Sequence, residues 1–89
     1  MNVCYKVLIS GTVQGVYFRS SAQQQAIDFS LSGYARNLAD GNIEVMLCGE
    51  MNNIEHMLEW LAHGPENAVV EAVNFEQVAL QKHSFFSIG

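Results

Sequence analysis

An arginine at the start of an expected helix is the clearest candidate for chemistry in this sequence. The stretch "GTVQGVYFRSS" (residues 11–21) runs from a glycine-rich loop into a helical pattern, and Arg19 lies where the helix begins. A helix N-terminus carries partial positive charge, so the dipole alone disfavours a cation there. Free backbone N–H groups beside a guanidinium do suit an anion such as phosphate. We therefore expect an anion site built from this loop and Arg19.

A carboxamide, Asn37, is expected to lie beside this loop. It is near the end of a predicted strand at residues 34–38, which follows the first helix. If that strand runs parallel to a first strand at residues 3–10, both strands end at the same edge of the sheet. Backbone amides, Arg19 and Asn37 would then meet at one corner of the fold. Arg36 precedes Asn37 and should point to the opposite face, towards solvent, where it could steer anions.

Hydrophobic periodicity and turn residues predict two helices and five strands. The expected helices cover residues 18–31 and about 52–63, and the expected strands cover residues 3–10, 34–38, 43–49, 68–78 and 85–88. Gly11 is expected to close the first strand and Gly33 to end the first helix. An Asp40-Gly41 turn should join the second and third strands, and Gly64-Pro65 should end the second helix.

The element order is β-α-β-β-α-β plus a short terminal strand. It indicates an α+β, ferredoxin-like split βαβ sandwich, in which two helices cover one face of an antiparallel sheet. With 89 residues and 49% hydrophobic content, residues 1–89 are expected to form a single domain.

Composition, charge and residue spacing argue against several classes of partner and location. Nine acids against four bases give a net charge of −5, which is unfavourable for nucleic-acid binding. No apolar run approaches the about 20 residues that span a membrane, and the N-terminus lacks a signal-peptide pattern, so a cytoplasmic protein is expected. The cysteines and histidines show no metal-ligand spacing, so no metal is expected. The histidines should lie at the surface and Trp60 should pack in the interior.

Two segments resemble the signatures of the acylphosphatase family. "GTVQGVYFR" (11–19) is similar to the family pattern G-x-V-Q-G-V-x-F-R, and "GYARNLADGNIEVMLCG" (33–49) is similar to its G-aromatic-x-basic-N-x-x-x-G-x-V pattern, with Ile43 in place of a valine. The downstream "WLAHGPENAVVEAV" is also similar to the family, so the resemblance covers nearly the whole chain.

The resemblance implies a monomeric enzyme that hydrolyses the carboxyl–phosphate bond of acyl phosphates without metal or cofactor. Inorganic phosphate would then be a product and a competing ligand. Arg19 would bind the phosphate together with the backbone amides of Gln14, Gly15, Val16, Tyr17, Phe18 and Arg19 itself, and Asn37 would position the attacking water. Gln14 is expected to act through its backbone alone. Tyr17 and Phe18 are expected to pack, although Tyr17 could instead line the acyl side of the pocket.

The two cysteines, Cys4 and Cys48, lie on strands expected to be antiparallel neighbours, so they could face each other. They could be two buried thiols, as a reducing cytosol would favour, or a disulfide, as in some bacterial relatives of this family. Two other functions stay open from the residues alone. One is a non-catalytic phosphate-binding module, and the other is a protein-interaction or nucleic-acid module on the same fold, which the net charge disfavours.

Overall fold

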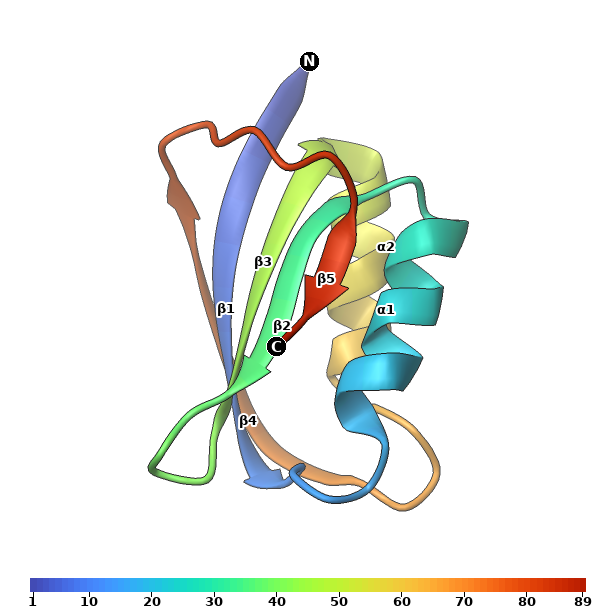
Figure 1. Cartoon of the computed structure of the whole chain (residues 1–89), viewed down its shortest axis with the longest axis vertical. Helices are drawn as coiled ribbons and strands as arrows, with labels where there is room; N and C mark the ends of the chain where they lie inside the picture. The colour runs from blue at the N-terminus through green and yellow to red at the C-terminus, as the bar shows by residue number, and fades with distance from the viewer.

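A five-stranded β-sheet with two helices on one face forms the architecture of the chain (Figure 1). It is the α+β, ferredoxin-like fold that the sequence predicts. The computed structural model describes residues 1–89. The elements, in chain order, are β1 (Asn2–Thr12), α1 (Phe18–Asp28), β2 (Ser32–Asn37), β3 (Ile43–Glu50), α2 (Met51–Leu61), β4 (Val69–Val78) and β5 (Phe86–Ile88). No helix has the length and apolar character needed to cross a membrane.

The strands lie in the order β4-β1-β3-β2-β5. β1 and β2 are both antiparallel to β3, so they run parallel to each other and end at the same edge of the sheet. The expectation of a wholly antiparallel sheet is wrong for the last strand, because β5 pairs parallel with β2. Figure 1 shows the reason: the chain leaves β4, crosses the end of the sheet, and comes down along the free edge of β2.

The main core lies between the helices and the sheet. β1 contributes Val7 and Ile9, which alternate along the strand as predicted and are fully buried. From α2, Ile54, Met57 and Leu61 are buried at helical spacing. β1 and α2 each bury one face in this core, whereas residues 43–48 of the central strand β3 are buried on both faces of the sheet.

Two glycines have other roles than the sequence suggested. Gly11 does not close β1, because the strand continues to Thr12 after a register shift between Ser10 and Gly11. A Cβ at Gly11 would collide with the backbone oxygen of Val69, so the glycine permits the close approach of β4. Gly33 does not end the first helix. It lies inside β2, and α1 ends earlier, at Asp28.

The cysteines face each other across β1 and β3, as predicted. Their Cα atoms are 4.2 Å apart and the two sulfur atoms form a disulfide. The pair is buried with Met46 on the sheet face away from the helices, and the Gln81 N–H donates to Sγ of Cys4 at 3.3 Å.

Candidate active site

The loop between β1 and α1 has backbone N–H groups without an acceptor in the protein. The N–H groups from Gln14 to Ser20 donate to no other group of the protein, since the first backbone bond of this region comes from Ser21 to the oxygen of Tyr17. No side chain caps the start of α1, and its first turn has no acidic residue. The helix start is therefore electropositive and open to an anion.

Gly15 gives the loop its shape. Its φ is +76°, in the left-handed region, whereas a Cβ added there would meet no atom within 4 Å. The glycine is thus needed for its backbone conformation, because no atom of the protein would collide with a Cβ there. Two residues later Tyr17 also has a positive φ, of 60°, and the helix begins directly after it.

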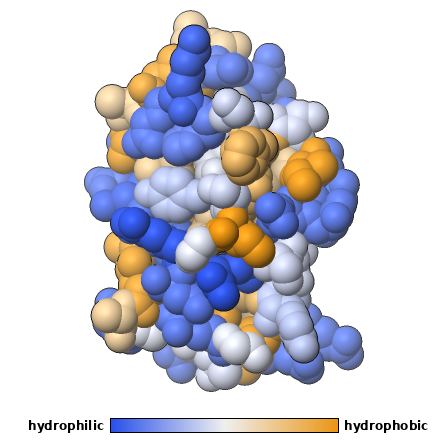
Figure 2. All heavy atoms as spheres, in the orientation of Figure 1, coloured by the Kyte–Doolittle hydropathy of each residue, from blue (hydrophilic) through white to orange (hydrophobic).

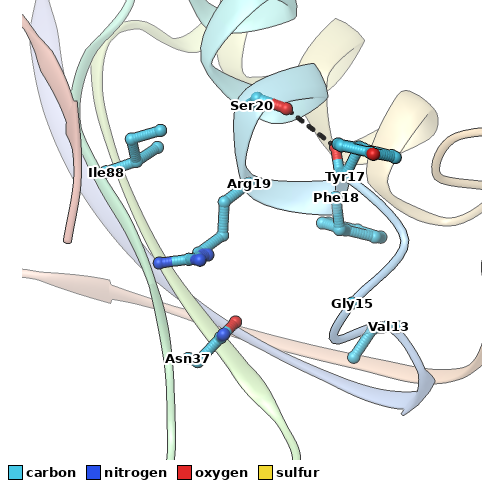
Figure 3. Close-up of a pocket in the computed structure, with 8 residues that line it drawn as sticks. All are labelled: Val13, Gly15, Tyr17, Phe18, Arg19, Ser20, Asn37 and Ile88. Atoms are coloured by element: carbon cyan, nitrogen blue, oxygen red, sulfur yellow. Dashed lines mark hydrogen bonds between the residues drawn. The ribbon is translucent and has the colours of Figure 1, made fainter.

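Arg19, the second residue of α1, reaches across the hollow between α1 and the sheet. Its Nη1 donates to the backbone oxygen of Gly89, just beyond β5, at 3.1 Å. This bond engages one edge of the guanidinium and fixes its direction. Figure 3 shows the guanidinium between Ile88 and Asn37, with the loop that carries Gly15 on the far side of the hollow.

Asn37 lies at the end of β2 on the helix side of the sheet. Along β2, Ala35 faces the core and Arg36 the opposite side, so alternation directs Asn37 towards α1. In Figure 3 its carboxamide points towards the guanidinium of Arg19. The structure therefore brings together Arg19, Asn37 and the loop around a hollow of about 340 Å³. The lining residues are Val13, Gly15, Tyr17, Phe18, Arg19, Ser20, Asn37 and Ile88.

The side chain of Gln14 has a role that the sequence analysis missed. Its Nε2 donates to the backbone oxygens of Leu38 and Asn42, both at 2.9 Å. These two carbonyls belong to the hairpin that follows Asn37, so Gln14 connects the candidate anion loop, residues 13–17 between β1 and α1, to the strand end that carries the carboxamide. The residues next to Gln14 in the sequence give no sign of these two acceptors, which lie 24 and 28 residues further along the chain.

The two aromatic residues at the start of α1 differ in burial. Phe18 is 1% exposed and packs against Trp60 with ring centroids 5.8 Å apart, as expected. Tyr17 is 82% exposed, so the expectation that it packs is wrong. Its left-handed backbone directs the side chain outward, where it lines the rim of the hollow.

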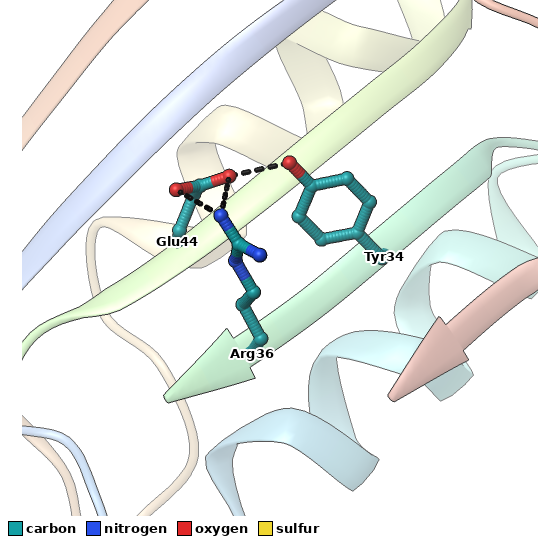
Figure 4. A network of polar contacts seen from close by, with 3 residues as sticks. All are labelled: Tyr34, Arg36 and Glu44. Atoms are coloured by element: carbon teal, nitrogen blue, oxygen red, sulfur yellow. Dashed lines mark hydrogen bonds and ion pairs between the residues drawn. The ribbon is translucent and has the colours of Figure 1, made fainter. Parts of the chain in front are cut away.

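Arg36 belongs to a separate polar network on the other face of the sheet (Figure 4). Its Nη2 lies 3.2 and 3.3 Å from the two carboxylate oxygens of Glu44, which also accepts a short hydrogen bond from the Tyr34 hydroxyl. Because Glu44 neutralises Arg36, any steering of anions by this arginine is weakened.

The network shifts the pKa values of its members. Burial alone would raise the pKa of Glu44, but the hydrogen bonds from Tyr34 and Arg36, with the charges of Arg36 and Lys6, outweigh it and lower that pKa. Burial, and then the hydrogen bond to Glu44, raises the pKa of Tyr34. The hydrogen bond to Glu44 raises the pKa of Arg36.

The hollow has a simple electrostatic character. Its lining contains no carboxylate and no imidazole, so Arg19 and the backbone N–H groups dominate the local field. Figure 2 shows deep blue, hydrophilic surface directly beside a small orange, hydrophobic patch near the middle of the visible face.

Comparison with known proteins identifies the family. The family profile of acylphosphatases matches residues 5–88. Over 89 residues the chain is 67% identical to an acylphosphatase of Colwellia psychrerythraea, and the alignment covers 100% of both chains. The chain belongs to the acylphosphatase family. It is an enzyme that hydrolyses acyl phosphates, as the two signature segments predict.

Solved acylphosphatases share the fold over its full extent. The structure from Coxiella burnetii is 39% identical with a TM-score of 0.96, and the match covers 99% of this chain and 93% of that one. The structure from Bacillus subtilis is 30% identical with a TM-score of 0.95, and the match covers 100% of this chain and 99% of that one. The acylphosphatase fold therefore includes the β1–α1 loop and the end of β2.

Proposed function

We propose that Arg19 and the backbone N–H groups of residues 14–19 hold the phosphoryl group of the acyl phosphate, and that Asn37 positions the attacking water. The observation that carries this proposal is the meeting of a guanidinium, a carboxamide and unpaired backbone donors around one small hollow. The guanidinium can donate two parallel N–H bonds to phosphate oxygens, which a lysine cannot do.

The reaction needs little beyond this arrangement. The water oxygen forms a bond to phosphorus while the bond from phosphorus to the carboxylate oxygen breaks. Negative charge spreads over the three non-bridging oxygens, where Arg19 and the N–H groups stabilise it. The carboxylate is a good leaving group, and a phosphate oxygen accepts the proton of the water. The products are a carboxylate and inorganic phosphate, with no metal or cofactor in the proposed mechanism.

The two side chains have separable roles, which gives the test. Arg19→Ala should lower kcat/KM for benzoyl phosphate by about 10³-fold or more and abolish competitive inhibition by inorganic phosphate. Asn37→Ala should lower kcat by about 10²–10³-fold and leave phosphate inhibition nearly unchanged. Near-normal turnover in either variant would contradict the assignment. Intact phosphate binding with no turnover in the wild type would favour a binding module.

Arg36→Ala is the matched control. It removes the same charge as Arg19→Ala, but from the opposite face of the sheet, where Arg36 pairs with Glu44. We expect it to change kcat/KM by less than about threefold, because the charge of Arg36 is already paired with Glu44 and is screened by salt. Circular dichroism of each variant establishes that it is folded.

We also propose that residues 1–89 act as one domain and as a monomer. Support comes from the sheet edges: β5 has only three residues, and β4 carries Glu71 and Glu76, features that disfavour pairing between sheets. Sedimentation or light scattering would test this.

A cytoplasmic location stays a prediction. The Cys4–Cys48 pair bears on it, because reducing compartments keep thiols free, and alkylation of freshly lysed cells would report the redox state.

A further inference from the structure

The last strand is attached to the active-site helix by a glutamine outside the signature motifs. Nε2 of Gln23 donates to the backbone oxygen of Phe86, the first residue of β5, at 2.8 Å. Gln23 lies one turn after Arg19 on α1, so the two side chains share one face of the helix. Arg19 in turn donates to the backbone oxygen of Gly89, the residue that directly follows the other end of β5.

The Phe86 carbonyl points away from the sheet. The oxygen of Phe85 and the N–H of Gly89 both bond to β2, and backbone groups alternate in direction along a strand, so the Phe86 carbonyl faces the outer side of β5. Gln23 is the group of the protein that satisfies it. The remaining attachments of β5 are its ladder with β2, the buried ring of Phe86, and a long hydrogen bond from Ser87 to Gly33.

We propose that Gln23 is a positioning residue for Arg19, acting through β5. By holding Phe86 against α1, Gln23 fixes the strand whose end presents the Gly89 oxygen to the guanidinium. It also sets the place of Ile88, which forms one wall of the hollow. This inference rests on the proposed role of Arg19 in holding phosphate. Gln23 itself is absent from the lining of the hollow, so its effect must pass through the strand.

The test removes the hydrogen bond in two ways. Gln23→Met keeps a side chain of similar length, and Gln23→Ala removes the side chain beyond Cβ. Gln23→Met and Gln23→Ala are compared with the wild type by kcat, KM and the inhibition constant of inorganic phosphate, with benzoyl phosphate as substrate, well below the unfolding transition. A misdirected Arg19 weakens phosphate binding in the ground state and the transition state alike. We expect KM and the inhibition constant to rise about three- to tenfold in both variants, with a smaller change in kcat.

Gln24→Ala is the control on the same helix. Gln24 is exposed and bonds only Asp28, so its loss should leave both constants unchanged. A variant lacking Gly89 tests the route: in that background Gln23→Met should raise KM and the inhibition constant clearly less than it does in the full chain, because the connection through the Gly89 oxygen is already broken.

Three results would overturn the inference. One is a lower melting temperature in Gln23→Met with an unchanged phosphate inhibition constant, which would mean a structural role only. The second is an equal effect in Gln24→Ala. The third is full additivity with the loss of Gly89. If Arg19→Ala keeps its activity, the proposed function itself fails. If Arg19→Ala is inactive but Gln23→Met behaves as wild type, only the inference about Gln23 fails.

Discussion

Replacing Gln14 with alanine should loosen the contact between the two parts of the proposed active site, the β1–α1 loop and the end of β2. The change removes both hydrogen bonds from Nε2 to the hairpin carbonyls of Leu38 and Asn42. Each carbonyl keeps one backbone donor, since Gly41 N–H bonds Leu38 and Leu38 N–H bonds Asn42. No acceptor is left unsatisfied, so each lost bond should cost about 0.5–1 kcal/mol, at the lower end of the usual range.

The stability loss is therefore about 1–2 kcal/mol, which in a domain of this size lowers the melting temperature by about 5–15 °C. The effect on activity should be larger than this loss suggests. Gln14 holds the anion loop to the strand end that carries Asn37, and a shift of about 1 Å in a catalytic group can cost about 100-fold. We expect kcat for benzoyl phosphate to fall at least about tenfold at a temperature where the variant is folded.

Asp40→Ala is the matched control for this prediction. It removes the side-chain acceptor of the Asn42 N–H, at 3.0 Å, from the same hairpin but leaves the bonds to Gln14 intact. Its kcat should stay within about twofold of wild type. The reasoning is refuted if Gln14→Ala and Asp40→Ala have the same kcat once both are folded, because the connection to the loop would then be irrelevant to catalysis.

Two further predictions concern stability. The pKa of Glu44 is lowered in the folded state, so its carboxylate stabilises the fold above the unfolded pKa of about 4.3, and this stabilisation is lost as pH falls through the folded pKa. In urea unfolding from pH 6 to pH 3, the free energy of unfolding should therefore fall less steeply for Glu44→Gln than for wild type. Equal slopes would contradict this prediction. The disulfide between Cys4 and Cys48 closes a 44-residue separation, and reducing it should lower the free energy of unfolding by up to about 4 kcal/mol by the chain-entropy argument. Because the pair lies at the opposite end of β1 from the hollow, KM at a temperature where the reduced protein is folded should not change, and a changed KM would show coupling that the structure does not suggest.

Much of the fold could be predicted from the sequence because each element carries a local pattern. Alternation in β1 and helical spacing in α2 identify the buried faces, and Asp40-Gly41 marks the hairpin. The direction of β5 could not be predicted in this way. Three residues carry no directional signal, and only the path of the preceding segment over the end of the sheet makes the strand parallel to β2.

The candidate site was predicted as far as its charge and topology allow. Arg19 is anomalous at a helix start, and the end of β2 must lie at the same edge as the loop, so Asn37 was expected nearby. The supporting contacts of Gln14 and Gln23 could not be found. Each is a flexible amide that bonds a backbone oxygen from a distant segment, and no residue type in that segment marks the partner. The backbone of Tyr17 was missed because a left-handed conformation is unusual for a non-glycine residue.

The most direct test of the account is hydrolysis of benzoyl phosphate in ¹⁸O-labelled water with EDTA present. If water attacks phosphorus in a site formed by Arg19, Asn37 and the backbone N–H groups, the rate should be unaffected by EDTA and the label should appear in inorganic phosphate. Arg19→Ala should lose nearly all of this phosphate release. Loss of turnover on chelation, or label in benzoate, would contradict the proposed mechanism.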